Sequence, residues 1–169
     1  VHKYMDTFTD DETAIYSFEA QLDLSDSWGV SIVSATSYMD REVNGVFDLS
    51  PFSNGGIEHD FPKPAPNEDK RFAVGLYNFS DITQFTQEIR AVSTDKGPLD
   101  YVIGGFYKDV STLTRADRSV VESYGAAVDP IVREAETDFD EQEIAIFGQL
   151  GYQLNEQFKL SIGGRYFSI

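Results

Sequence analysis

The sequence predicts an all-β fold: an antiparallel, up-and-down transmembrane β-barrel to which this chain contributes about six strands. Three observations lead to this prediction: segments that alternate apolar and polar residues, connections that are short and long in turn, and aromatic residues near both ends of the apolar stretches. Successive side chains of a strand point to opposite faces, so alternation indicates a sheet between two different solvents. A membrane barrel has this pattern, with lipid outside and water or protein inside.

The clearest strand is expected near 13–24. Its even-numbered residues, from Ala14 to Leu24, are all apolar, and its odd-numbered residues are polar except for Ile15. Five further segments show the same two-residue period, more weakly in the second strand than in the first. They lie near 28–39, 83–93, 99–108, 142–154 and 158–169.

The connections between these strands differ greatly in length. Short links of turn-forming residues, such as Ser25-Asp26-Ser27, follow the first, third and fifth strands. Long connections near 40–82 and 109–141 follow the second and fourth strands, and connections of that length are usually functional loops or disordered. Outer-membrane barrels sort their connections in this way, so the long ones are predicted to be extracellular loops.

Aromatic residues on the apolar side of the strands are predicted to form two belts at the lipid interfaces, where amphipathic rings are favoured. From the first belt to the second, the strand near 28–39 spans roughly 25 Å along the membrane normal, which matches the apolar band of such barrels. The alternative is that aromatic residues in the core of any sheet give such belts by chance. The predicted belt residues are Tyr16, Trp28, Tyr38, Phe85, Tyr101, Tyr107, Tyr152, Phe158 and Tyr166.

Composition excludes several classes of function. The chain has 29 acidic and 13 basic residues, a net charge of −16, which disfavours nucleic acid as a partner because phosphate binding needs clustered cations. It has no Cys and two His, and no Ser, His and Asp are arranged as a catalytic triad, so we expect no catalytic residue, no metal site and no cofactor. The acidic run from Glu134 to Glu143 lacks the ligand spacing of an EF-hand, which favours a solvated charge run over a Ca²⁺ site.

Three charged residues are predicted to face the interior of the barrel: Glu88, Arg90 and Arg165. An Arg on the lipid face costs about 2–4 kcal/mol at the membrane midplane, so these side chains belong on the other face. Our functional interpretation is that they contact a plug domain or line the transport path. The alternative is pairing within the barrel wall.

Two pairs of segments resemble a known family. Phe85–Ala91 followed by Gly97–Tyr107, and Ile146–Leu154 followed by Leu160–Phe167, are similar to the strand pairs of TonB-dependent outer-membrane receptors. The shared patterns are F-x-Q-E-x-R before a short turn, x-G-x-F-Y after it, and G-G-R-Y in the later hairpin. The resemblance covers roughly residues 12–39, 83–108 and 142–169.

The resemblance implies a barrel of about 22 strands in the outer membrane of a Gram-negative bacterium. An N-terminal plug would fill it, and TonB would energise the import of a scarce nutrient, most often a ferric siderophore. Its partners would be outer-membrane lipid, TonB and a small-molecule ligand.

Barrels start at eight strands, so we expect this chain to be an internal fragment, without the plug and the TonB-binding region. Two alternatives stay open. One is a soluble β-sandwich that binds carbohydrate through exposed Tyr and Trp, and the other is a porin-type barrel that works without TonB.

Overall fold

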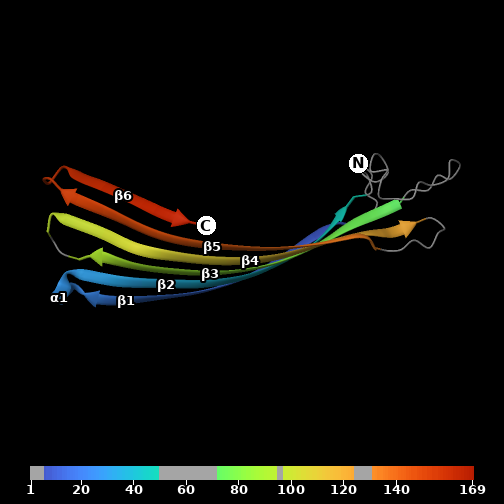
Figure 1. Cartoon of the computed structure of the whole chain (residues 1–169), viewed down its shortest axis with the longest axis horizontal. Helices are drawn as coiled ribbons and strands as arrows, with labels where there is room; N and C mark the ends of the chain where they lie inside the picture. The colour runs from blue at the N-terminus through green and yellow to red at the C-terminus, as the bar shows by residue number, and fades with distance from the viewer. Residues whose placement is uncertain (1–5, 50–71, 95–96, 124–130) are drawn as a thin grey trace. The chain divides into compact units, whose positions relative to one another are not determined.

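The computed structural model describes residues 6–49, 72–94, 97–123 and 131–169. They form one six-stranded antiparallel sheet whose strands lie side by side in chain order, as the up-and-down prediction requires (Figure 1). The sheet is not closed in this chain, and β1 and β6 form its two edges. The elements are β1 (Phe8–Leu24), α1 (Ser25–Trp28), β2 (Val30–Asp48), β3 (Phe72–Ser93), β4 (Leu99–Ser123), β5 (Ile131–Gln153) and β6 (Lys159–Ser168).

The chain divides into two compact units. Unit 1 consists of residues 1–13, 41–82 and 112–139, and unit 2 consists of residues 14–40, 83–111 and 140–169. Strands β1 to β5 each contribute residues to both units, whereas β6 belongs to unit 2 alone.

The register of β5 and β6 defines two faces of unit 2. Phe147 pairs with Arg165, and the next pair along the strands is Ile146 with Tyr166. Because neighbouring positions of a strand point to opposite sides, these two pairs lie on opposite faces. We call the face that bears Phe147 and Arg165 the charged face, and the face that bears Ile146 and Tyr166 the apolar face.

Most strands are longer than the sequence predicted. The predicted loops near 40–82 and 109–141 are strand at their ends, because β2 continues to Asp48, β3 begins at Phe72, β4 continues to Ser123 and β5 begins at Ile131. The prediction failed because alternation reports a difference in solvent between two faces, whereas backbone hydrogen bonds alone maintain a strand. Segments with the same character on both faces show no alternation and were therefore predicted as loops. The part of β4 after Asp109 is largely polar on both faces, whereas the start of β3 has apolar residues on both. The middle of each predicted loop, 50–71 and 124–130, lies outside the described residues.

The link between β1 and β2 is a single helical turn rather than a simple hairpin turn. The Ser25 N–H donates to Oδ1 of Asp23 at 2.9 Å, and the Gly29 N–H donates to the Ser25 carbonyl at 3.1 Å. Gly29 has a φ of 63°, a left-handed conformation that glycine adopts without strain and that ends the turn. Trp28, predicted to begin the second strand, lies in this helix instead.

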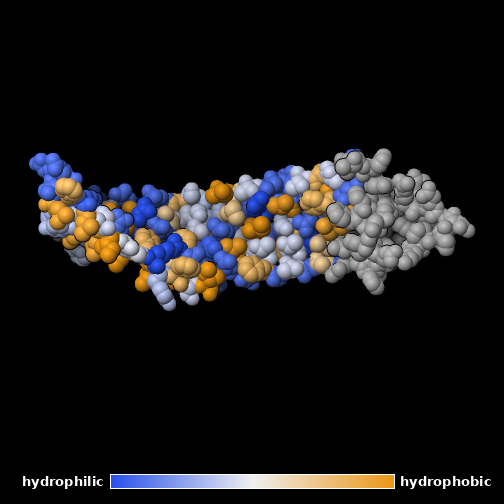
Figure 2. All heavy atoms as spheres, turned by 90° about the horizontal axis from the view of Figure 1, so that it is seen from above, coloured by the Kyte–Doolittle hydropathy of each residue, from blue (hydrophilic) through white to orange (hydrophobic). Residues whose placement is uncertain are grey.

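The sheet buries little of its apolar surface. Among the described residues the buried hydrophobic side chains are Val33, Val46, Val74 and Ala145, while large side chains such as Phe18 are exposed (69%). Figure 2 shows hydrophobic residues at the surface among hydrophilic ones on the face that it presents. A water-soluble domain of this length buries far more apolar area, so the sheet needs further material against it. No helix in the described part of the chain is long and apolar enough to cross a membrane.

Candidate functional site

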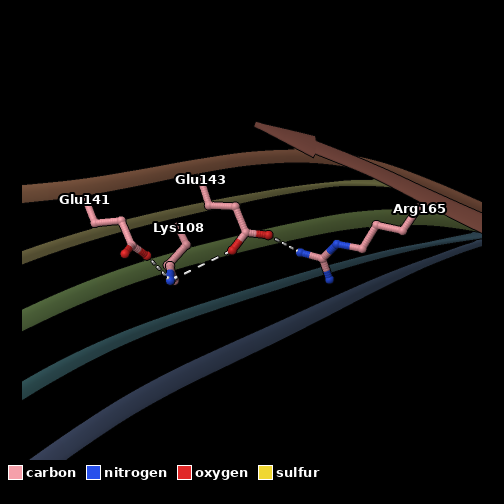
Figure 3. A network of polar contacts seen from close by, with 4 residues as sticks. All are labelled: Lys108, Glu141, Glu143 and Arg165. Atoms are coloured by element: carbon pink, nitrogen blue, oxygen red, sulfur yellow. Dashed lines mark hydrogen bonds and ion pairs between the residues drawn. The ribbon is translucent and has the colours of Figure 1, made fainter. Parts of the chain in front are cut away.

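Four charged side chains from β4, β5 and β6 form a connected network on the charged face (Figure 3). The Lys108 ammonium donates to Oε1 of Glu141 at 2.5 Å and lies 3.8 Å from Oε2 of Glu143. The other oxygen of Glu143 accepts a hydrogen bond from Nη2 of Arg165. Two cations thus balance two carboxylates, and Glu143, the most buried of the four side chains with 15% exposed, joins them.

A buried small residue shares the face with the network, and an aromatic ring contacts it. Ala145, two positions after Glu143 and therefore on the same face, is 2% exposed. The Arg165 guanidinium on β6 lies 5.0 Å from the centre of the Phe106 ring on β4, within range of a cation–π interaction. Arg165 therefore bridges three strands, with Glu143 on β5 holding one of its amino groups and Phe106 lying under its planar head.

A groove of about 300 Å³ adjoins this network. Phe106 lines both, because its ring lies against Arg165 and also forms part of the groove. Apart from Phe106, Phe18 and Ala35, the lining consists of residues with hydroxyl groups and carboxylates. The hydroxyls of Ser37 and Thr86 share a hydrogen bond of 2.6 Å. The other lining residues include Ser17, Glu19 and Glu88. The groove can accept hydrogen bonds from a ligand or a protein segment placed against it.

The structure separates the three predicted site residues into two groups. Glu88 accepts a hydrogen bond from Nη1 of Arg90 at 2.7 Å, within one strand, and Glu88 also lines the groove. Arg165 instead belongs to the network with Glu143. The described contacts do not join Arg165 to either Glu88 or Arg90. In the structure all three residues form ion pairs within this chain.

The sequence analysis missed Phe106, Lys108, Glu141 and Glu143. Glu143 lies in the strand predicted near 142–154, on its polar side with Ala145 and Phe147, although the acidic run from Glu134 to Glu143 was interpreted as solvated. Continuing the same alternation to Glu141 would have placed that residue on the charged face as well. Their partner Lys108 was the last residue of the predicted fourth strand, where it faces away from Tyr107.

The predicted belt residues have mixed positions. The rings of Phe85 and Tyr107, from neighbouring strands, lie 6.3 Å apart at 55°, a tilted arrangement that is favourable for aromatic pairs. Trp28 lies in α1 and Phe158 precedes β6, so neither is in a strand. The remaining members lie within strands: Tyr16, Tyr38, Tyr101, Tyr152 and Tyr166.

Unit 1 contains its own ion pairs between neighbouring strands. Arg41 on β2 donates through Nε and Nη2 to the two carboxylate oxygens of Asp11 on β1, at 2.9 and 2.6 Å. These hydrogen bonds from Arg41 hold the pKa of the Asp11 carboxyl below its usual range and raise the pKa of Arg41. Arg115 and Glu136 form a similar pair at 2.9 Å, and Glu136 raises the pKa of Arg115.

Part of the predicted acidic run belongs to these pairs. Glu136, Glu141 and Glu143 each bond a cation, as described above. The described part of the chain contains no group of three or more His, Asp or Glu side chains arranged to hold a metal ion. The two histidines, His2 and His59, lie outside the described residues.

Comparison with known proteins gives one family and one class of fold. No curated protein matches the chain. Among solved structures, the siderophore receptor PiuA from Acinetobacter baumannii is similar with a TM-score of 0.51 and 11% sequence identity. The match covers 95% of this chain and 29% of that receptor, so the chain spans less than a third of its length. At this identity the similarity concerns the fold alone.

The family comparison covers nearly the whole chain. The family described as "TonB dependent receptor-like, beta-barrel" matches residues 2–169. Together with the open antiparallel sheet and its two contrasting faces, this match confirms the predicted resemblance and sets aside the soluble sandwich. The chain belongs to the β-barrel family of TonB-dependent receptors, which are outer-membrane transport proteins.

Proposed function

We propose that this chain forms part of the barrel wall of a receptor that imports a ferric siderophore with energy supplied through TonB. The observation that carries the proposal is the contrast between the two faces of unit 2. The charged face bears an ordered network beside a polar groove, while the same strands expose Ile103, Ile146 and Leu150 on the apolar face. A transport wall needs this contrast, with polar groups inside and lipid outside.

In this proposal the charged face lines the barrel lumen. Lys108, Glu141, Glu143 and Arg165 largely neutralise one another, so the network stiffens the wall rather than offering free charge. The groove beside it offers the carboxylates of Glu19 and Glu88 to a plug domain, which would be supplied by sequence outside this chain. The aromatic residues of the apolar face would lie at the lipid headgroups.

The structural neighbour is the reason for proposing a siderophore as the ligand. This neighbour is a siderophore receptor, and the two chains share a fold at 11% identity. Ligand choice depends on sites rather than on folds, so the experiment offers several ligand classes separately.

The test is uptake of iron-55 by an iron-starved Gram-negative host in which the full-length receptor is the sole route for ferric siderophores. Catecholate, hydroxamate and carboxylate siderophores would be offered separately, with and without TonB. We expect saturable uptake of at least one of them that is lost without TonB. Uptake that continues without TonB and rises linearly with concentration would indicate a porin-type barrel. TonB-dependent uptake of another nutrient alone would overturn the siderophore assignment.

Variants of the charged face test its part in transport. Glu88→Gln and Arg165→Gln should lower the uptake rate at unchanged receptor level in the membrane, because each alters the face proposed to contact the plug. Glu156→Gln, in the exposed turn before β6, is the matched control. Equal uptake by all three variants would remove the charged face from the transport path.

A further inference from the structure

The apolar face of unit 2 carries a second groove, on β4, β5 and β6, which we call the glycine groove. Two depressions, of about 460 and 690 Å³, both include Gly148 and Gly164 and therefore form one continuous groove. These two residues are partners in the register of β5 and β6, so the floor of the groove is a pair of residues without side chains. The exposed side chains around this floor are Ile103, Ile146, Leu150, Ile162 and Tyr166.

Local structure does not account for the two glycines of the floor. A glycine weakens a strand, and it usually marks a bulge, a left-handed backbone or the close approach of another group. The pairs of β5 and β6 follow one another without a bulge, and of the glycines in the described part of the chain Gly29 alone has a positive φ. A Cβ atom at Gly164 would meet no atom within 4 Å, and one at Gly148 would make an ordinary contact of 3.4 Å. What the two glycines provide is the open groove itself.

The chemistry of the glycine groove selects an apolar ligand. Its walls are aliphatic and aromatic side chains. Arg165 adjoins the floor but directs its side chain to the charged face, where it bonds Glu143. The proposed function, on which this inference rests, assigns the apolar face to lipid. The apolar groups that meet such a face in a membrane are the acyl chains of lipids.

The length of the glycine groove fits one acyl chain rather than a membrane-spanning helix. From the pair of Leu150 and Ile162 to the pair of Ile146 and Tyr166 the strands advance four residues, roughly 13 Å. A spanning helix needs about 20 residues, or about 30 Å, of apolar contact. The groove covers less than half of that length, which suits the tail of a lipid from one leaflet.

Two observations place the headgroup of this lipid at the short-turn end of the groove. The larger depression, of about 690 Å³, includes Tyr101, which lies near the start of β4 and the short link that follows β3. Towards the other end of β4, on the same face, Oδ2 of Asp109 accepts hydrogen bonds from Tyr107 at 2.7 Å and from Gln142 at 3.0 Å. A carboxylate there disfavours the phosphates of lipid A. The short turns of outer-membrane barrels face the periplasm, where the leaflet consists of phospholipid.

We propose that the glycine groove binds one acyl chain of a phospholipid from the periplasmic leaflet. The chain lies on Gly148 and Gly164 between the aliphatic walls. The hydroxyl of Tyr101, at the headgroup end, donates to an ester or phosphate oxygen of the same lipid.

The experiment is native mass spectrometry of the delipidated full-length receptor, titrated separately with palmitoyl-oleoyl phosphatidylethanolamine and with lipid A. The wild type should bind one phosphatidylethanolamine more tightly than any further lipid molecule. Gly164→Val should weaken this first binding step about tenfold, because the valine keeps about two CH₂ groups of the acyl chain out of the groove. Since an added Cβ has open space at this position, the variant should keep the wild-type fold.

Ala20→Val is the matched control, because it adds bulk to the apolar side of β1, outside the glycine groove. It should leave the first binding step unchanged. If Gly164→Val does not fold, Gly148→Ala and Gly164→Ala made together fill the floor with less bulk and test the same site. Siderophore uptake should be the same in all these variants, so failure of the lipid site and failure of the proposed transport are separate results.

Three results would overturn the proposal. The first is that the wild type binds no phosphatidylethanolamine preferentially, or that folded Gly164→Val binds it equally well. The second is tighter binding of lipid A than of phosphatidylethanolamine, which would assign the groove to the other leaflet. The third is a dimer or a copurifying polypeptide that Gly164→Val removes, which would assign the groove to a protein partner.

Discussion

Asp100 on β4 and Lys159 on β6 form an ion pair of 2.6 Å across the intervening strand β5. Adjacent strands lie about 4.8 Å apart, so this pair spans about twice that distance over the charged face. It passes over Gly151, where a Cβ atom would collide with the Asp100 carboxylate. The absence of a side chain at one position of β5 therefore allows its two neighbouring strands to be joined.

We predict that Gly151→Ala abolishes the energetic coupling between Asp100 and Lys159. In the wild type, a double-mutant cycle of Asp100→Asn and Lys159→Gln on urea unfolding should give about 0.5–1 kcal/mol, as for other exposed pairs. In the Gly151→Ala background it should give about zero. The total unfolding free energy should change little, because Ala is favoured over Gly in a strand by roughly 0.5–1 kcal/mol, which offsets the lost ion pair.

Gly164→Ala serves as the control for that experiment. An added Cβ at Gly164 meets no atom within 4 Å, so the coupling between Asp100 and Lys159 should persist in this variant. Persistence of the coupling in Gly151→Ala as well would contradict the crossing geometry.

Glu143 and Arg165 should be energetically coupled, whereas Glu143 and Arg90 should not. Glu143 bonds Arg165 directly, and Arg90 bonds Glu88 instead. A double-mutant cycle of Glu143→Gln with Arg165→Gln should give about 0.5–1 kcal/mol after allowing for solvent screening at the half-exposed Arg165. The cycle with Arg90→Gln should give a value within error of zero, and similar values for the two cycles would show that the network in Figure 3 does not form.

An arginine introduced at two neighbouring positions of β5 should destabilise the protein at one position and be tolerated at the other. Leu150 lies on the apolar face and Gln149 on the charged face. Leu150→Arg should destabilise the protein folded in lipid vesicles by about 2 kcal/mol, and by more if the residue lies at the midplane. Gln149→Arg should be tolerated, because its side chain avoids lipid. An equal loss of stability in both variants would contradict the assignment of the apolar face to lipid.

The pair of Asp11 and Arg41 should make stability depend on pH in a defined window. The hydrogen bonds from Arg41 lower the folded-state pKa of Asp11, so the carboxylate stabilises the fold above its unfolded pKa of about 3.9. This contribution is lost as the pH falls through the lower, folded-state pKa. The stability difference between wild type and Arg41→Gln should therefore be constant from about pH 5 to 8 and shrink below about pH 4.

Glu12→Gln is the control for the pH experiment, because Glu12 adjoins Asp11 in β1 and points to the opposite side. It should leave the difference between wild type and Arg41→Gln unchanged. A difference that stays constant down to pH 2 would show that Asp11 is not the partner of Arg41 in solution.

Much of the fold could be predicted because alternating apolar and polar residues indicate a strand whose two faces meet different solvents. In the segment from Ala14 to Leu24 every second residue is apolar, which fixed both the strand and its faces. The strands continue beyond the predicted ends, for example through Arg41 in β2 and Arg115 in β4. There the two faces no longer differ in polarity, so the sequence shows no alternation that would predict a strand. Trp28 was misplaced for a different reason, since Gly29 ends a helical turn through a backbone conformation that periodicity does not report.

The sequence by itself determined the fold class, the number and order of the strands, their alternating faces and the family resemblance. These follow from the local period of two and from short motifs, which need no knowledge of what lies beside them. The tertiary structure alone decided which charges meet. Lys108 and Glu141 are 33 positions apart, and Asp117 and Phe8 line one cavity although they belong to different strands, β4 and β1. The register between strands brings such residues together. Register depends on how two segments pair, and neither segment determines it alone.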